Sequence, residues 1–399
     1  MPSLSWASTA LALIGVGATV AGCDAGGDGS GENEFVTVYV SAPLRGPSGA
    51  DGRDVADGAR RALADAGRSA GDLEVRAEYL DGSEGNGGGA GWTPARAAAN
   101  ARTATEDSTA IAYVGDFESG ATRASLPVTN DARMLQVSAA SSAIDLVAPF
   151  PGTDELPDAQ PSGERTFGRV IPSDDAQAEA AASWARRLAG RRAAVLSDGT
   201  QFGEVMTRTF STAAGDLGLR TTRLAERSGI SCPVDGLAYV GAQLGRHDDL
   251  IIAPAAAPPT ADDGLLLATD GILLDRRTLG IQRCESALRV VSGALDPSQL
   301  PPAGREFAAA FEREYGRWPG RYAAYGYEAM AVVLDAIDRA GDRGAEREAV
   351  VDAFFETADR DSILGTYSID DVGDTTLESM TGYRLVNGRP QPETELSPP

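Results

Sequence analysis

From residue 35 onward, apolar runs typical of strands alternate with segments whose apolar residues recur at helical spacing. Residues 35–40, a β-branched and aromatic run, predict a buried strand. Residues 54–66 follow with Val55, Ala59 and Leu63 on one side, which predicts a helix. The loop between them, residues 43–52, is rich in Gly and Pro.

The same alternation continues along the chain. The pattern predicts further strands at residues 73–80, 110–114, 134–137, 192–196 and 249–252. A helix is expected to begin near Pro94, after the Gly-rich loop 82–92, and a second one spans residues 203–214. No Gly-Lys-Ser/Thr follows the Gly-rich loop, so it is not a phosphate-binding loop.

Strands that alternate with helices form parallel sheets covered by helices. The rhythm restarts after residue 168, and 399 residues are too many for one ordinary core. We therefore predict an α/β protein with two doubly wound parallel-sheet lobes. Ligands of such sheets bind where strand carboxyl ends meet helix amino ends.

The composition of the chain excludes several classes of function. Hydrophobic residues make up 42% of the chain, enough for packed cores. The formal net charge of −23 repels nucleic acid phosphates and anionic lipid headgroups. All 35 basic residues are Arg, which excludes every mechanism that needs a Lys. The single His, His247, is read as a solvated residue, and it cannot form a two-His metal site. We expect no catalytic residue, metal or cofactor.

The amino terminus reads as an export signal. Residues 7–20 are apolar and too short to span a bilayer comfortably. The sequence Val-Ala-Gly-Cys at residues 20–23 resembles the bacterial lipobox, which implies a signal peptide over residues 1–22 and a lipid on Cys23. The Gly- and Asp-rich residues 23–35 predict a flexible tether. Residues 1–6 depart from the pattern because they carry no Arg or Lys. The alternative is a buried apolar helix with an ordinary Cys.

Two other cysteines remain, Cys232 and Cys284. In an exported chain, an even pair predicts a disulfide. The alternative is a pair of free buried thiols.

Several segments resemble one family in order and spacing. Residues 43–58 resemble its first loop and helix, residues 115–122 its Ser-Gly-Ala-Thr turn, and residues 137–142 its Ile-Ser-Pro-x-Ala-Thr segment. Further likenesses are residues 169–177, 198–203, 269–271, 322–328 and 365–370. Together the segments resemble the type I periplasmic-binding-protein fold, and within it the leucine/isoleucine/valine-binding receptors of ABC transporters.

The resemblance implies two lobes joined by three crossings, with crossing segments near Arg169 and Gly365. We expect lobe one to contain residues 36–170 plus 296–362 and lobe two to contain residues 171–295 plus 363–391, followed by a tail at residues 392–399.

The resemblance also implies a binding site. Ser119, Ser141 and Ser142 stand where the family binds the α-carboxylate of its ligand, and each precedes a predicted helix, whose dipole attracts an anion. Asp270 looks like the carboxylate that faces the ligand's ammonium. Phe202 replaces a Tyr of the family and keeps an aromatic wall. The alternatives are a helix cap for Ser119 and a turn Asp for Asp270.

Two departures concern the ligand's side chain. The pocket aromatic of leucine receptors falls near Asp51, and residues 254–258 replace expected tyrosines by Pro and Ala. Together with Glu118, Asp51 predicts a roomier and more acidic pocket, so a branched aliphatic ligand is not assured. The alternative is that Asp51 and Glu118 point to solvent.

We therefore expect a solute-binding lipoprotein that is exported and lipid-anchored at the outer face of the cytoplasmic membrane. It would be a monomer that captures a small zwitterionic ligand, an amino acid or analogue, and passes it to an ABC permease. Two alternatives remain: a sensor lipoprotein that signals to a membrane partner, and a carboxylate-dependent hydrolase.

Overall fold

The structure is a computed structural model. It describes residues 35–86, 90–148, 159–189, 191–197, 199–224, 230–232, 237–241, 252–254, 264–273 and 287–399. The chain divides into two units, residues 1–33 and residues 34–399, and the fold described below belongs to the second.

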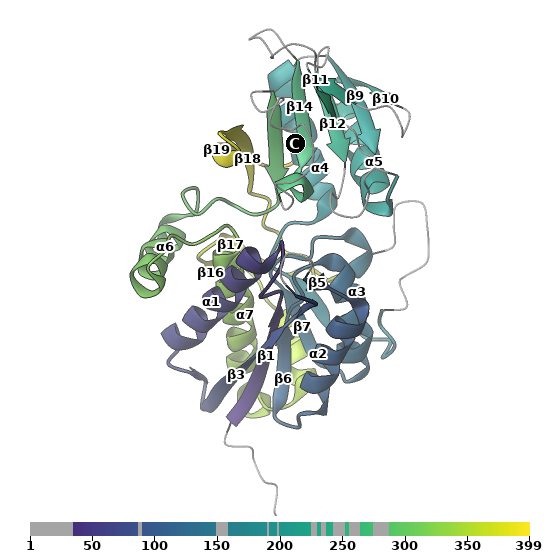
Figure 1. Cartoon of the computed structure of the whole chain (residues 1–399). Helices are drawn as coiled ribbons and strands as arrows, with labels where there is room; N and C mark the ends of the chain where they lie inside the picture. Colours follow the sequence, from purple (N-terminus) through teal and green to yellow (C-terminus); the bar gives the residue numbers. More distant parts are fainter. Residues whose placement is uncertain are drawn as a thin grey trace, which may run out of the picture. The chain divides into compact units, whose positions relative to one another are not determined.

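The first lobe is built on a sheet that is parallel except for its first, hairpin-paired strand (Figure 1). Its described strands, in order across the sheet, are β2 (Ser69–Ala70), β3 (Leu73–Asp81), β1 (Phe35–Ala42), β6 (Ala110–Val114), β7 (Leu135–Ser138) and β8 (Phe167–Arg169). The strands predicted at residues 35–40, 73–80, 110–114 and 134–137 are all present, each within a residue or two of its expected bounds.

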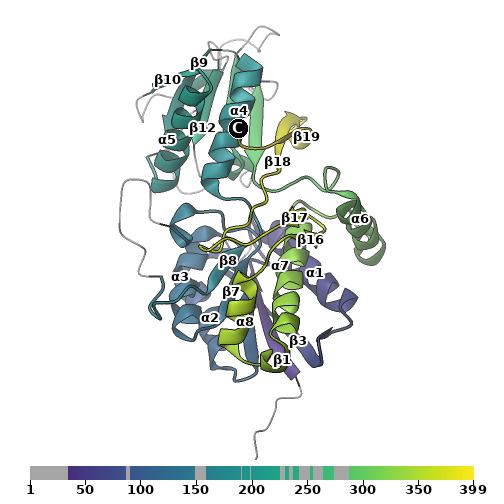
Figure 2. The ribbon, with the colours of Figure 1, turned by 180° about the vertical axis from the view of Figure 1, so that it is seen from behind.

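Helices cover both faces of this sheet. Those of one face are α1 (Gly49–Asp65), α7 (Ala323–Arg339) and α8 (Arg347–Phe355), and those of the other are α2 (Pro94–Glu106) and α3 (Ser119–Asp131). Helices α1 and α7 come from opposite ends of the chain and lie side by side (Figure 1). Helix α7 also lies against α8 (Figure 2).

Local sequence explains where these helices begin. Helix α2 starts with Pro94 after Thr93, whose hydroxyl accepts a hydrogen bond from the backbone N–H of Arg96. Helix α1 starts at Gly49, five residues before the predicted position, so part of the expected loop is helical. Gly52 permits this start, because a Cβ there would lie only 1.9 Å from the carbonyl oxygen of Pro43.

The second lobe repeats the plan. Its described sheet strands, in order, are β10 (Arg220–Arg223), β9 (Arg192–Ser197), β12 (Leu237–Gly241), β14 (Leu265–Thr269), β15 (Leu288–Ser292), β18 (Met380–Val386) and β19 (Arg389–Leu396). The first five are parallel, and β18 and β19 close the sheet in antiparallel pairing. Helices α4 (Asp174–Ala189) and α5 (Gln201–Asp216) pack on one face over an apolar cluster that includes Trp184, Phe210 and Tyr239.

Smaller elements complete the described part. They are β4 (Ser83–Glu84), β5 (Gly91–Trp92), β11 (Ile230–Cys232), β13 (Ile252–Pro254), β16 (Arg360–Ser362), β17 (Gly365–Tyr367), α6 (Pro302–Tyr315), and the 3₁₀ turns η2 (Ile144–Leu146), η3 (Asp270–Leu273) and η5 (Gly341–Arg343). The strand predicted at residues 249–252 falls mostly outside the described residues.

The chain passes between the two sheets three times, from β8 to α4, from β15 to α6, and from β17 to β18. The third passage lies later than the sequence suggested. Leu364, Tyr367 and Ile369 are buried in the apolar core of the first lobe, so the assignment of residues 363–379 to the second lobe was wrong. The change of lobe follows this segment, and β18 begins at Met380.

The expected tail at residues 392–399 was also wrong in part. Strand β19 runs to Leu396, which is buried in the core of the second lobe. Strand β19 contains Pro390 and Pro392, which is possible because it is an edge strand, where some backbone groups need no partner.

Candidate functional site

The predicted ligand residues lie at the carboxyl ends of parallel strands, although they are far apart in sequence. Asp51 follows β1, Glu118 and Ser119 follow β6, and Asp270 follows β14. Ser141 and Ser142 follow β7, and Phe202 follows β9 in the first turn of α5. The carboxyl edge of a doubly wound sheet is where such folds hold their ligands.

Ser119 is the first residue of α3, and Glu118 is its N-cap without a capping side-chain bond. The Ser119 hydroxyl accepts a hydrogen bond from the backbone N–H of Ala143, at 3.2 Å. The hydroxyl therefore ties α3 to the loop after β7. The first backbone N–H groups of a helix have no acceptor within the helix, so the start of α3 offers donors to an anion.

Ser141 makes several hydrogen bonds within the first lobe. Its side chain is fully buried, and its Oγ lies 2.7 Å from Oγ1 of Thr122 and donates to the carbonyl oxygen of Asp116, at 3.0 Å. Its backbone N–H donates to Oγ of Ser138, at 2.9 Å. These bonds make Ser141 a positioning residue that joins the turn before α3 to the loop after β7.

Ser142 connects this loop to the second lobe. Its carbonyl oxygen accepts from the backbone N–H of Asp174, the first residue of α4, at 2.9 Å, and its hydroxyl bonds the Asp174 carboxyl. Burial raises the pKa of Asp174 to about 6, and the nearby carboxylate of Asp270 adds to the shift. The Oδ1 atom of Asp174 is buried without a partner among the described residues. Ser142 and Asp174 thus join the two lobes at the first crossing.

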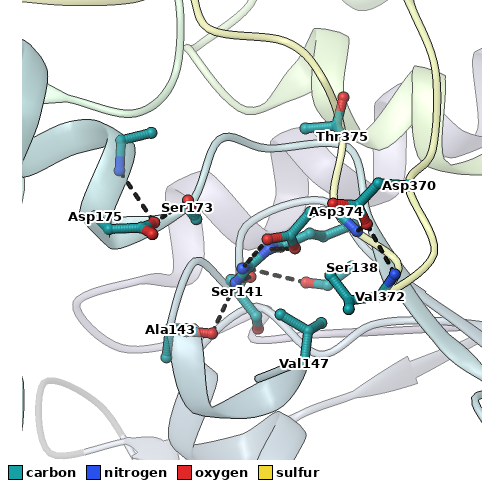
Figure 3. A network of polar contacts seen from close by, with 12 residues as sticks. Ser138, Ser141, Ala143, Val147, Ser173, Asp175, Asp370, Val372, Asp374 and Thr375 are labelled. Carbon is teal, nitrogen blue, oxygen red and sulfur yellow. Dashed lines mark hydrogen bonds and ion pairs between the residues drawn. The ribbon is translucent and has the colours of Figure 1, made fainter. Parts of the chain in front are cut away.

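Arg169 and Asp374 support the same loop, and Figure 3 shows Asp374 and Asp370 in a polar network with Ser141 and Ala143. Arg169, which is fully buried, donates from Nη1 to the carbonyl oxygen of Ala143 at 2.7 Å. Its other nitrogens bind both carboxylate oxygens of Asp374, and the Asp374 backbone N–H donates to Oδ1 of Asp370. The first and third crossings therefore share one polar network that positions the serine loop.

Asp270 begins η3 at the end of β14. Its Oδ1 accepts from Nε2 of Gln177 at 3.2 Å, and its Oδ2 accepts from the hydroxyl of Ser292 at 2.9 Å. These neutral donors orient the carboxylate without neutralising it, and each oxygen keeps a lone pair for a ligand. This geometry suits a carboxylate that faces a ligand cation.

Sequence reasoning missed Arg321, which precedes α7. Its Nη2 lies 3.4 Å from Oδ2 of Asp51, and its positive charge interacts with the carboxylates of Asp51 and Asp270. No local pattern around residue 321 indicates this position, because the contact joins α1 to the start of α7. Among the residues described, Arg321 is the cation that accompanies the site carboxylates.

Asp51 and Glu118 do not simply point to solvent. Asp51 is 24% exposed and pairs with Arg321. The pKa of Glu118 is raised to about 7, mainly by burial and also by the charges of Asp116 and Asp51. A hydrogen bond from Ser48 opposes this shift. Both carboxyl groups therefore belong to the same electrostatic environment.

Aromatic side chains frame the start of α3. Phe117 meets Tyr322 edge-to-face with a centroid distance of 4.9 Å. A Cβ on Gly120 would lie 2.3 Å from the ring of Trp92, so only glycine allows this ring to approach the helix. Phe202 lies elsewhere, against the apolar core of the second lobe.

Other expectations lie outside the described residues. These are Cys23, His247 and Cys284, and of Cys232 only the backbone is described. Within the part of the chain that the structure describes, no cluster of His, Cys, Asp or Glu is arranged to hold a metal ion. Over the same residues, no helix combines the length and the apolar character that a membrane crossing requires.

The fold is the two-lobed arrangement of type I periplasmic binding proteins. The family model described as "Periplasmic binding protein" matches residues 36–226, and these residues belong to that family. A comparison with curated proteins finds no match. By their titles, the structural neighbours are solute-binding proteins, among them a leucine-binding protein and a substrate-binding protein of a branched-chain amino acid transporter.

Solved structures support the fold over nearly the whole chain. A leucine-binding protein from Thermotoga maritima is 21% identical, covers 91% of this chain and 99% of its own, and has a TM-score of 0.65. A branched-chain amino acid binding protein from Streptococcus pneumoniae, in complex with isoleucine, is 16% identical, covers 92% and 100%, and has a TM-score of 0.64. A solute-binding protein from Rhodopseudomonas palustris, in complex with 3,4-dihydroxybenzoic acid, is 12% identical, covers 92% and 98%, and also has a TM-score of 0.64.

Proposed function

We propose that this protein captures a small zwitterionic ligand, an amino acid or a close analogue, and delivers it to an ABC permease. The Asp270 carboxylate carries the proposal, because neutral donors orient it at a strand end and no cation among the described residues bonds to it. It would bind the ligand's ammonium, and a charge-assisted hydrogen bond is about twice as strong as a neutral one.

The ligand's α-carboxylate would bind at the start of α3. The backbone N–H groups of Ser119 and Gly120 stand at the positive end of the helix dipole, where an anion is stabilised. Ser142 would add a contact from the loop after β7, its hydroxyl turning from the Asp174 carboxyl to the ligand, whereas the hydroxyl of Ser141 bonds groups of its own lobe.

Contacts from both lobes would give the ligand a higher affinity for the closed arrangement than for an open one. That difference in affinity is what a ligand needs to shift the population toward closure. By their titles, solved neighbours are in complex with leucine, isoleucine or 3,4-dihydroxybenzoic acid, so the fold accepts ligands of several chemistries.

The test begins with a thermal-shift screen of the protein against amino acids, amides and small acids. A ligand at a hundredfold its dissociation constant should add about 2.7 kcal/mol to the free energy of unfolding. Calorimetry with the best ligand then compares two variants. Asp270→Ala should cost about 2–5 kcal/mol of binding free energy, and Ser142→Ala about 1 kcal/mol.

The proposed site requires that Asp270→Ala weakens binding more than Ser142→Ala does. If Asp270→Ala binds the ligand as tightly as the parent protein, the ammonium site is wrong and a ligand without an amine becomes the better candidate. Delivery to a permease is tested separately, by ligand uptake in cells that carry or lack this chain. Unchanged uptake together with tight binding would favour a sensor.

A further inference from the structure

Arg321 differs from the other buried arginines of the protein. Arg169 is fully buried, and its guanidinium bonds both oxygens of Asp374 and the carbonyl oxygens of Ala143 and Ser141. The Arg321 side chain is only 12% exposed, yet its contact in the described structure is one long bond of 3.4 Å to Asp51. Its guanidinium carbon also stands 5.0 Å from the ring centre of Tyr322.

A guanidinium has five N–H donors, and buried donors in folded proteins find acceptors. Arg321 therefore retains donors for an acceptor that the described residues do not supply. Its neighbours in the electrostatic environment are Asp51 and Asp270, which belong to the predicted ligand site. The donors of Arg321 are thus available where a ligand would bind.

Acceptors lie beside these donors. The Asp51 carboxylate is partly exposed, and its charge, with that of Asp116, helps to raise the pKa of Glu118. The N–H donors of Arg321 and the carboxylate acceptors of Asp51 therefore lie next to each other. Asp270 is separate from this pair, because the proposed function assigns it to the ammonium.

We propose that Arg321 and Asp51 determine specificity by binding a neutral carboxamide or ureido group at the side-chain end of the ligand. The carbonyl oxygen of that group accepts from the Arg321 guanidinium, and its NH₂ donates to the Asp51 carboxylate. This inference rests on the proposed function, because it assumes an amino acid held through its ammonium and α-carboxylate.

Other side-chain chemistries fit this pair less well. A second carboxylate on the ligand would meet Asp51 and Glu118, and a second cation would meet Arg321. An aliphatic side chain would leave a buried guanidinium without acceptors, and sites built for hydrogen bonding reject analogues that lack the polar group. The carboxamide and the ureido group offer an NH₂ donor and a separate acceptor oxygen without net charge, whereas a hydroxyl has one oxygen for both roles.

Calorimetry on the full-length protein in detergent tests the inference. The probes are glutamine, asparagine and citrulline, compared with glutamate, leucine and lysine. We expect one of the first three to bind at least about tenfold more tightly than any of the last three, a difference of about 1.4 kcal/mol. In Arg321→Met this preference over leucine should fall by about tenfold or more.

Two further variants separate recognition from folding. Arg313→Met removes a cation from an exposed position on α6 and should leave all the affinities unchanged. Asp51→Asn keeps the shape of the side chain but changes its acceptor set, and it should also reduce the preference for the amide over leucine. If Arg321→Met does not fold, as judged by the absence of cooperative thermal unfolding, Asp51→Asn replaces it in the comparison of amide and leucine affinities.

The outcomes distinguish the two proposals. Tighter binding of leucine, lysine or glutamate than of every amide and ureido probe overturns the inference and leaves the proposed function standing, because all are zwitterionic amino acids. An amide preference that survives both Arg321→Met and Asp51→Asn also overturns it. Failure of every amino acid to bind overturns the proposed function and the inference with it.

Discussion

Arg169 and Asp374 form a two-bond ion pair, from Nε to Oδ1 at 2.6 Å and from Nη2 to Oδ2 at 2.9 Å, across 205 positions of the sequence. Arg169 ends the last strand of the first sheet, and Asp374 lies in the third passage between the lobes. The pair joins two crossings and also supports the loop that carries Ser141 and Ser142.

Replacement of Asp374 by Ala should therefore destabilise the protein strongly. It leaves the guanidinium of Arg169 buried without its carboxylate, which costs about 3–5 kcal/mol of unfolding free energy. Glu348→Ala is the control, because it breaks an exposed ion pair with Arg133 that is worth less than about 1 kcal/mol. Urea unfolding measures both, and equal effects would show that the Arg169 pair adds no special stability.

Replacement by Ala should lower the stability of the protein at one helical glycine and raise it at another. A Cβ on Gly58 of α1 would lie 2.0 Å from the carbonyl oxygen of Ala323, so Gly58→Ala must separate α1 from α7 and should cost about 1–3 kcal/mol. Nothing lies within 4 Å of a Cβ on the exposed Gly215 of α5, so Gly215→Ala should stabilise by about 0.5–1 kcal/mol. Thermal unfolding compares them, and a neutral Gly58→Ala would contradict the close α1–α7 packing.

Stability should fall as the pH rises from about 4 to 6. Burial raises the pKa of Asp116 and of Asp174 from the ordinary 3.8 to about 6. Between these values the folded protein binds more protons than the unfolded chain, so the free energy of unfolding decreases with pH in this window. Urea unfolding of the parent protein at several pH values measures the slope.

Asp174→Asn should make that slope shallower, because Asn cannot bind the proton. Asp352→Asn, at an exposed position of α8, removes the same charge and should leave the slope as in the parent protein. A slope that Asp174→Asn does not change would assign the pH dependence to other groups.

Cys23 is expected to carry a lipid that tethers the protein to the membrane. Cys23→Ser should release the protein from the membrane fraction or leave its signal peptide uncleaved, because the lipid-bearing thiol is lost. Fractionation of cells with immunoblotting measures this. Unchanged retention and unchanged processing of the variant would contradict the proposed anchor.

Cys232 and Cys284 are expected to form a disulfide in the exported protein. Mass spectrometry of the non-reduced mature protein should find one linked peptide pair, and reduction should lower the unfolding free energy by about 2–5 kcal/mol. Two free thiols after export would contradict the pairing.

Much of the fold follows from the sequence because its signals are local. Runs such as residues 110–114 and the helical spacing after Gly49 encode which faces are buried, and alternation of the two elements predicts parallel sheets. The boundaries of the third crossing were missed because the Gly365–Tyr367 segment looks like a crossing but packs its Tyr367 ring in the first core.

The strand–helix alternation of the sequence by itself predicts that a ligand site lies at strand carboxyl ends, and the family resemblance implies Asp51, Glu118, Ser119 and Asp270 as its residues. Only the tertiary structure decided that the Ser141 hydroxyl is engaged within the protein and that Arg321 accompanies Asp51 and Asp270. The reason is physical: local periodicity determines which side of an element is buried, whereas a contact between α1 and the start of α7 depends on how distant elements pack.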